Sequence, residues 1–107
     1  MGDDMYSHMD KSAIISALRA NKEQLSALGV KSMALFGSIV REQTHSGSDI
    51  DLAAIYDENI VRDLLDMGGV AAAIEEVLGT DNFDLANEKN LNPHVRGNFS
   101  REHVRIF

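Results

Sequence analysis

Two aspartates interrupt an apolar segment near the middle of this chain of 107 residues, in the stretch SDIDLAAIY. Residues i and i+2 of a β-strand project from the same face, so a strand over 50–56 places Asp49 and Asp51 together. Aspartate is depleted in strands, and two carboxylates 4 Å apart repel by roughly 1 kcal/mol in water and roughly 4 kcal/mol at an effective dielectric constant of 20. Mg²⁺ relieves such repulsion, because it prefers carboxylate, water and phosphate oxygens. The pair therefore favours a magnesium site, although an exposed acidic pair is the alternative.

A glycine and a serine follow the preceding apolar segment. A strand over 31–36 that ends at Gly37 and Ser38 and continues into a helical turn presents free backbone N–H groups, which form a natural phosphate site. The Ser38 hydroxyl can donate to a phosphate oxygen, and Arg41 can add a charge-assisted contact. Ten residues separate Ser38 from Asp49, enough for the chain to return to the same pocket. Alone, this pair of residues would be an ordinary turn.

A third carboxylate, Asp84, stands in the apolar segment NFDLA. If its strand lies beside the strand over 50–56, three carboxylates converge. Two of them could bind the metal that carries a nucleoside triphosphate. The third could help bind a second metal and accept the proton of the attacking hydroxyl, as in two-metal phosphoryl transfer.

The remaining apolar pattern predicts helices over 11–28 and 62–78, a short helix opened by Pro93 and a terminal strand over 104–107. Gly68 and Gly69 predict a kink or close packing in the second helix. We expect the apolar residues of that helix to face inward, namely Leu64, Leu65, Ile74, Val77 and Leu78. The order α-β-β-α-β-α-β predicts an α/β (α+β) domain of two layers, in which helices pack on one face of a small mixed β-sheet.

Composition narrows the possible functions. Residues 1–8 resemble an expression-tag remnant, which leaves 9–107 as the domain. The formal net charge of −7, or −5 without Asp3 and Asp4, argues against a nucleic-acid binder, which needs a basic face. The chain has no cysteine, which suits a reducing cytoplasm, and no apolar run near the ~20 residues of a membrane span. We therefore expect a cytoplasmic protein without a membrane partner.

The segment GSIVREQTHSGSDIDL resembles the G-S-x10-D-x-D signature of the DNA polymerase β-like nucleotidyltransferase superfamily. Within that superfamily the short chain is most similar to the minimal nucleotidyltransferase (MNT) family. The stretch over 63–86 resembles the family's next helix and third-carboxylate strand. Val40 and Glu42 depart from the alanine and glycine that are frequent in the family. The matching residues are Gly37, Ser38, Arg41, Ser48, Asp49, Asp51, Leu52 and Asp84.

The resemblance implies a nucleotidyltransferase fold and a specific activity. It implies catalytic, metal-binding carboxylates at Asp49, Asp51 and Asp84, two Mg²⁺ ions, and ATP as substrate. The nucleotide would be bound by Gly37, Ser38, Arg41 and Ser48. Because a single small domain leaves nothing to grip a large acceptor, a partner must present it. MNT proteins are commonly antitoxins, which implies transfer of AMP to a tyrosine of a cognate HEPN-domain RNase toxin.

Four alternatives remain open. The chain could be an antitoxin that neutralises its toxin by binding alone. It could modify a different substrate, or be a fragment of a repair-type polymerase. It could also be a structural domain without Mg²⁺.

Overall fold

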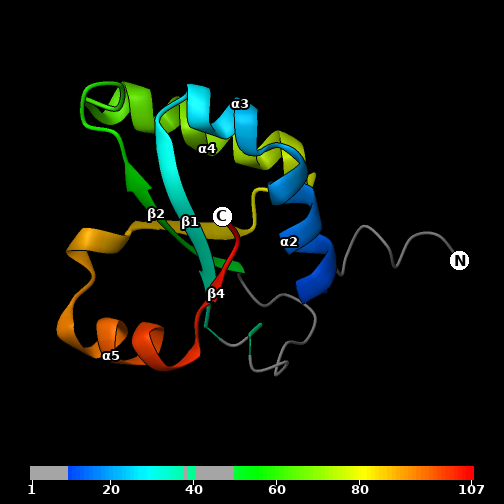
Figure 1. The fold of residues 1–107 in the computed structure, drawn as a ribbon, viewed down its shortest axis with the longest axis vertical. Helices are drawn as coiled ribbons and strands as arrows, with labels where there is room; N and C mark the ends of the chain where they lie inside the picture. Colours follow the sequence, from blue (N-terminus) through cyan, green and yellow to red (C-terminus); the bar gives the residue numbers. More distant parts are fainter. Residues whose placement is uncertain (1–9, 38, 41–49) are drawn as a thin grey trace, which may run out of the picture.

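The computed structural model describes residues 10–37, 39–40 and 50–107 (Figure 1). The segment interpreted as a tag, 1–8, lies outside them. The described elements follow the order α2 (Lys11–Ala20), α3 (Lys22–Ala27), β1 (Val30–Phe36), β2 (Ile50–Tyr56), α4 (Leu64–Leu78), β3 (Phe83–Asn87), a 3-10 turn (Glu88–Asn90), α5 (Pro93–Glu102) and β4 (Val104–Arg105).

The four strands form one mixed sheet in the order β3-β2-β1-β4. β1 runs antiparallel to both β2 and β4, whereas β2 and β3 are parallel. Parallel neighbours need a crossover connection, and α4 supplies it between β2 and β3. The predicted small mixed sheet with helices is thus confirmed, and β3 lies beside β2, which is the condition for Asp84 to approach Asp51.

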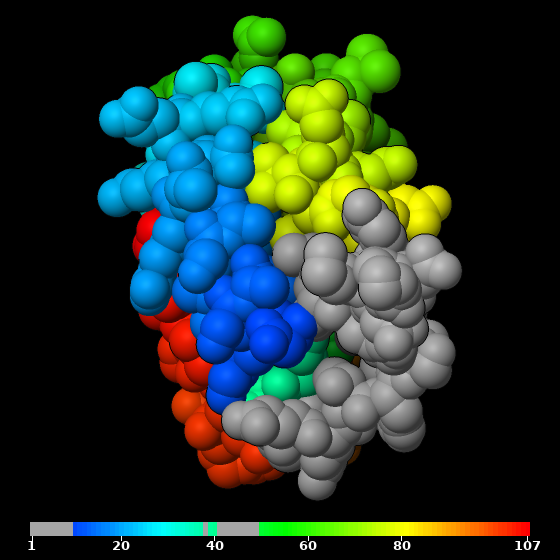
Figure 2. All heavy atoms as spheres, turned by 90° about the vertical axis from the view of Figure 1, so that its right-hand side faces the viewer, coloured from blue at the N-terminus to red at the C-terminus, as the bar shows by residue number. Residues whose placement is uncertain are grey.

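Helices cover both faces of this sheet. Alternate residues of β1 and β2, such as Leu35 and Leu52, pack with α2, α3 and α4 in the main core. Ala34, Phe36 and Ala53 project from the opposite face and pack against Phe99 of α5. Three helices therefore lie on one face, as expected, and α5 lies on the other, because β1 and β2 are apolar on both sides. Figure 2 shows α2 and the C-terminal part of α4 side by side on the three-helix face.

The helix predicted over 11–28 is two helices. Asp10 caps α2 as expected, since its carboxylate accepts a hydrogen bond of 2.8 Å from the Ala13 amide. Asn21 ends that helix, with φ −110° and ψ 21°. Its Nδ2 donates to the Ala17 carbonyl at 2.8 Å. The Asn21 side chain competes with the helix for backbone hydrogen bonds. The apolar residues keep helical spacing across this position, so their periodicity alone did not reveal the break.

The orientation predicted for the start of α4 is wrong. Leu64 and Leu65 are 83% and 85% exposed, although Ile74 and Leu78 are buried as expected. The carboxylate of Asp63 accepts a hydrogen bond of 3.0 Å from the Asp66 amide and so fixes the first helical turn. The buried face passes through Val70, Ile74 and Leu78, and at 3.6 residues per turn Leu65 lies on the side opposite to Ile74.

Gly68 and Gly69 lie within an uninterrupted α4. A Cβ at either position would meet no described atom within 4 Å. The close packing predicted for them is therefore absent among the described residues.

The C-terminal segment closes the sheet at β1. β4 is shorter than the predicted strand over 104–107. The Ile106 amide donates to the Met33 carbonyl at 2.8 Å, and Arg19 Nε of α2 donates to the Ile106 carbonyl at 2.7 Å. These bonds fasten the end of the chain to the three-helix face. No helix in the described part of the chain is long and apolar enough to cross a membrane.

Candidate active site

The described part of the site centres on two carboxylates at matching positions of adjacent strands. The parallel register of β2 and β3 pairs Asp51 with Asp84. Aligned residues of neighbouring strands project from the same face, and such strands lie ~4.8 Å apart. Asp51 is half-buried and Asp84 is exposed. The structure thus brings together two of the three predicted carboxylates, which are distant in sequence.

A cluster of aromatic rings lies beside Asp51, starting from the neighbouring strand β1. Phe36 of β1 pairs with Asp51 in the antiparallel register. Its ring meets Phe99 of α5 edge-on, with centroids 5.4 Å apart, and Phe99 stacks on His103 at 4.4 Å. His103 Nδ1 lies 2.7 Å from the Phe99 carbonyl. The carboxylates therefore lie on the face of the sheet that α5 covers. The sequence did not reveal this placement, because nothing in the sequence of α5 indicates which face of the sheet it covers.

Gly37 follows β1 with a φ of +86°, in the left-handed region that favours glycine. A Cβ at this position would overlap Oδ2 of Asp51 and lie 3.1 Å from its Cγ. The Gly37 backbone therefore packs directly against a predicted metal ligand. The sequence predicted close approach to a phosphate here, whereas the structure shows close approach to the Asp51 carboxylate.

The chain turns immediately after Gly37. The Val40 amide donates to the Gly37 carbonyl at 3.1 Å, and Ile39 is buried. This hydrogen bond lies in the turn that was predicted to follow Gly37 and Ser38. The described residues end there and resume at Ile50. Four predicted site residues lie outside the described ranges, namely Ser38, Arg41, Ser48 and Asp49.

The chemistry of the described donors fits a hard divalent cation. Asp51 and Asp84 provide carboxylate oxygens from aligned positions, and their mutual repulsion falls when a cation lies between them. Mg²⁺ typically takes one or two carboxylates and completes its shell with water and substrate phosphates. Among residues 10–37, 39–40 and 50–107, no group of three or more His, Cys, Asp or Glu side chains could hold a metal. Two carboxylates are therefore what Mg²⁺ typically takes from a protein, with water and phosphate oxygens completing its coordination.

A family model and a curated relative match nearly the whole chain. The model described as "Polymerase beta, Nucleotidyltransferase" matches residues 13–107. A protein of Methanocaldococcus jannaschii with the name "Putative protein adenylyltransferase" is 32% identical over 97 residues, which cover 89% of this chain and 96% of the relative.

Three solved structures share the fold. A structure described as a minimal nucleotidyltransferase has a TM-score of 0.66 and 32% identity, over 92% of this chain and 97% of the other. A toxin-antitoxin structure with AMP-PNP has a TM-score of 0.61 and 20% identity, over 92% and 73%. A complex of tri-AMPylated Shewanella oneidensis HEPN toxin with MNT antitoxin has a TM-score of 0.59 and 14% identity, over 87% and 71%. At these identities, the last two likenesses establish the fold alone.

Proposed function

The chain belongs to the polymerase β nucleotidyltransferase family, and we propose on that premise that it is a magnesium-dependent protein adenylyltransferase. Its acceptor is a tyrosine of a cognate HEPN-domain RNase toxin, and transfer of AMP from ATP neutralises the toxin. The observation that carries this proposal is the alignment of Asp51 with Asp84 beside the backbone of Gly37. Support for the acceptor comes from a structural neighbour that contains an AMPylated HEPN toxin.

The three carboxylates would hold the metal, and one of them would accept the proton. Asp49, Asp51 and Asp84 would be the ligands of two Mg²⁺ ions, which would supply positive charge to neutralise the triphosphate. The tyrosine oxygen attacks the α-phosphorus, the bond between that phosphorus and the bridging oxygen breaks, and pyrophosphate leaves. Asp84 accepts the phenolic proton. This role suits its exposed position at the edge strand, where an acceptor side chain can approach.

The segment after β1 binds the nucleotide. The Gly37 backbone and the Ser38 amide and hydroxyl contact phosphate oxygens, and Arg41 adds positive charge. Ser48 completes the pocket from the other end of the loop. A structural neighbour that contains AMP-PNP supports an adenine nucleotide as the ligand.

The test is transfer of a mass equal to AMP. We expect the protein, incubated with ATP, Mg²⁺ and its HEPN toxin, to add AMP to a toxin tyrosine, detected by peptide mass spectrometry. Asp51→Asn and Asp84→Asn should each lower the rate by at least 100-fold. Asp81→Asn is the matched control, because it removes an exposed carboxylate three residues before Asp84 and should leave the rate within about twofold. Equal rates for Asp84→Asn and Asp81→Asn would remove Asp84 from the mechanism.

The second candidate is an antitoxin that acts by binding alone. It is supported by structural neighbours that are complexes of a toxin with an antitoxin. The double variant Asp51→Asn/Asp84→Asn separates the two functions. If it still neutralises the toxin in cells while adding no AMP, binding is sufficient. If it fails to neutralise although it still binds the toxin, transfer is required.

A further inference from the structure

β3, the strand that carries Asp84, lies at an edge of the sheet. In the order β3-β2-β1-β4, the described sheet gives β3 a neighbour on one side, β2. The backbone groups of successive strand residues point alternately to the two sides of the strand. The Asn82 carbonyl accepts a hydrogen bond of 3.2 Å from the Ile50 amide of β2. The amide of Asp84 therefore faces β2, whereas the amides of Phe83 and Leu85 point away from the sheet.

The two edges of the sheet differ in how they are protected. Proteins protect exposed edges with short strands, lysine, proline or bulges, because unpaired backbone groups bind other strands. β4 has two residues and carries the charge of Arg105. β3 has five residues, FDLAN, without lysine or proline, and its register with β2 is continuous. Its one charged residue is Asp84, which the proposed function assigns to the metal. The unprotected edge is therefore the edge that carries the site.

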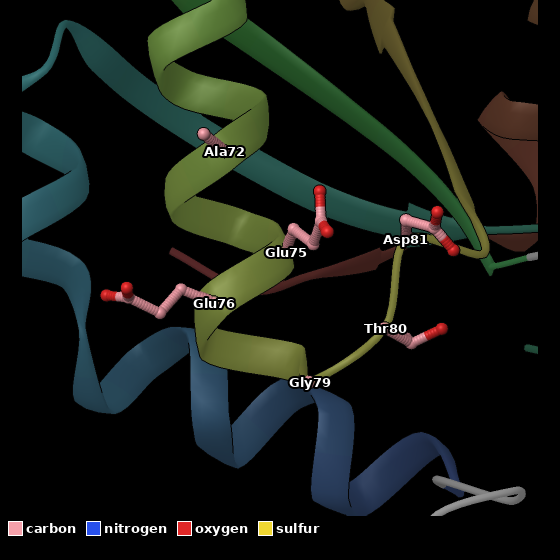
Figure 3. A pocket seen from close by; sticks show the side chains of 6 residues that line it. All are labelled: Ala72, Glu75, Glu76, Gly79, Thr80 and Asp81. Carbon is pink, nitrogen blue, oxygen red and sulfur yellow. The ribbon is translucent and has the colours of Figure 1, made fainter.

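The two segments that adjoin β3 both turn away from its edge. The chain reaches β3 from α4 through Gly79, Thr80 and Asp81, and this connection ends where the strand begins (Figure 3). After β3, Glu88 accepts a hydrogen bond of 3.0 Å from Arg105 of β4, so the chain there is held toward the interior of the sheet. Neither of these described segments therefore runs along the outer side of β3.

The carboxylates are open from the β3 side and closed from the β1 side. Asp84, Asp51 and Phe36 form an aligned row across the three strands. At the β1 end of this row, Phe36 is buried against Phe99, on which His103 stacks. At the β3 end, Asp84 is exposed. An acceptor side chain therefore reaches the carboxylates from the β3 edge, because the aromatic rings occupy the other end of the row.

We propose that an extended segment of the acceptor protein binds along the outer side of β3 as an additional strand and so presents its tyrosine to the site. This inference rests on the proposed function and specifies how its acceptor is held. Addition of a strand to an exposed sheet edge is a common mode of peptide recognition, in which backbone hydrogen bonds give affinity and alternate side chains give specificity. The amides of Phe83 and Leu85 donate to carbonyls of the added strand.

The position of the tyrosine follows from the alternation of side chains. Aligned residues of neighbouring strands, ~4.8 Å apart, project from the same face. A tyrosine aligned with Asp84 therefore projects from the α5 face, and its phenol ring is long enough to bring its oxygen to that carboxylate. The residues before and after the tyrosine project to the other face beside Phe83 and Leu85, which pack against the main core. We therefore expect apolar residues on both sides of the acceptor tyrosine.

The test is hydrogen exchange of the intact chain, resolved by residue with NMR spectroscopy, with and without the HEPN toxin. The outward amides of Phe83 and Leu85 should exchange fast in the free protein, since unpaired amides are unprotected. We expect the toxin to slow their exchange at least tenfold. The control is the Arg105 amide, which points outward on the opposite edge because the Ile106 amide bonds to the Met33 carbonyl. Its exchange should change by less than twofold.

AMP transfer is measured in the same complex after ATP and Mg²⁺ are added, which separates this proposal from the proposed function. AMP on a toxin tyrosine without slower exchange at Phe83 and Leu85 overturns the added strand and leaves the proposed function intact. Slower exchange at β3 alone, without AMP transfer, supports the added strand and contradicts the proposed function. Equal slowing at Arg105 overturns the added strand. So does slowing that appears in the chain alone at raised concentration, because a second copy then pairs with the edge.

A matched pair of variants at Leu85 tests the same edge by kinetics. Leu85→Pro removes the outward amide but not the hydrogen bonds of Asp84 and Ala86 to β2, and edge strands tolerate proline at such positions. It should raise the KM for the toxin at least tenfold and leave kcat within threefold. Leu85→Ala removes the same side chain, keeps the amide and should raise KM by less than threefold. Equal KM values for the two folded variants would contradict the proposal, and the exchange measurement on the wild type decides it if Leu85→Pro does not fold.

Discussion

Gly37 satisfies two requirements that only glycine meets together. Its φ of +86° costs ~1–2 kcal/mol for a residue with a Cβ, and a Cβ there would also overlap the Asp51 carboxylate. We predict that Gly37→Ala lowers the free energy of unfolding by about 2–4 kcal/mol and reduces nucleotidyl transfer, since Asp51 must move. Urea denaturation followed by circular dichroism measures the first effect.

Gly79 provides the matched control for that change. It has a φ of +73°, yet a Cβ there would meet no described atom within 4 Å. Gly79→Ala should therefore lose only the conformational part, about 1–2 kcal/mol, and leave transfer unaffected. Equal losses for the two variants would show that the contact with Asp51 contributes nothing.

Tyr56 carries an unsatisfied polar atom. Its hydroxyl is buried without a hydrogen-bond partner among the described residues, and burial raises its pKa above 10.0. We predict that Tyr56→Phe is neutral or stabilising by up to about 1 kcal/mol at pH 7, because an unpaired buried hydroxyl is removed. Thermal unfolding at pH 7 measures this, and a loss above 1 kcal/mol would indicate that the hydroxyl has a partner.

The raised pKa of Tyr56 also predicts in which direction the stability of the protein changes with pH. A folded-state pKa raised above the unfolded value gives stability that is present below pH 10 and is lost as the pH rises through the folded pKa. Stability should therefore fall as the pH rises above 10 in the wild type, and fall less in Tyr56→Phe. Parallel curves over that range would contradict the assignment.

At the scale of elements, periodicity located all four strands and the long helices but not their breaks and orientations. β2 occupies the predicted range, because alternation and length define a buried strand. Asn21 divides one predicted helix into two through its own side-chain hydrogen bond. Leu64 and Leu65 were expected inside because they are apolar, but they are exposed, because Leu65 precedes the buried Ile74 by about 2.5 turns and so lies on the opposite side of α4.

The Asp63 carboxylate caps the start of α4, so its removal should be measurable. We predict that Asp63→Ala destabilises the protein by about 1 kcal/mol, the usual value for a lost N-cap. In a domain of this size the melting temperature should fall by about 4–8 °C. Asp63→Asn keeps a capping oxygen and should fall by less than half as much. Equal losses would mean that the charge of Asp63, rather than its cap, stabilises the helix.

At the scale of the whole molecule, the site depends on topology. The D-x-D pair follows from strand alternation alone, and Gly37 from its position after an apolar strand. Asp84 joins them only because α4 returns the chain so that β3 lies parallel to β2, in register with Asp51. From the sequence, the convergence of the carboxylates could be predicted only on the condition that these two strands are neighbours. The placement of α5 over the carboxylate face could not be predicted from the sequence, because α5 is mostly polar and contributes one buried residue, Phe99.

The aligned carboxylates couple metal binding to the stability of the whole domain. Without a cation Asp51 and Asp84 repel, so we predict that Asp84→Asn is as stable as the wild type or more stable by up to about 1 kcal/mol. Saturating Mg²⁺ and ATP should stabilise the wild type, by ~2.7 kcal/mol at 100 times the dissociation constant, and Asp84→Asn far less.

The order of stability should therefore reverse when Mg²⁺ and ATP are added, as measured by thermal unfolding with and without both. If only the surface charge mattered, the order would not reverse, because removing any exposed carboxylate would change the stability by the same amount with and without Mg²⁺ and ATP. Asp81→Asn tests this, since its carboxylate is also exposed but lies outside the aligned pair. It should gain as much from Mg²⁺ and ATP as the wild type does. If Asp84→Asn gains equally, the cation is held without Asp84, and the alignment of β2 with β3 is a feature of the fold rather than of the site.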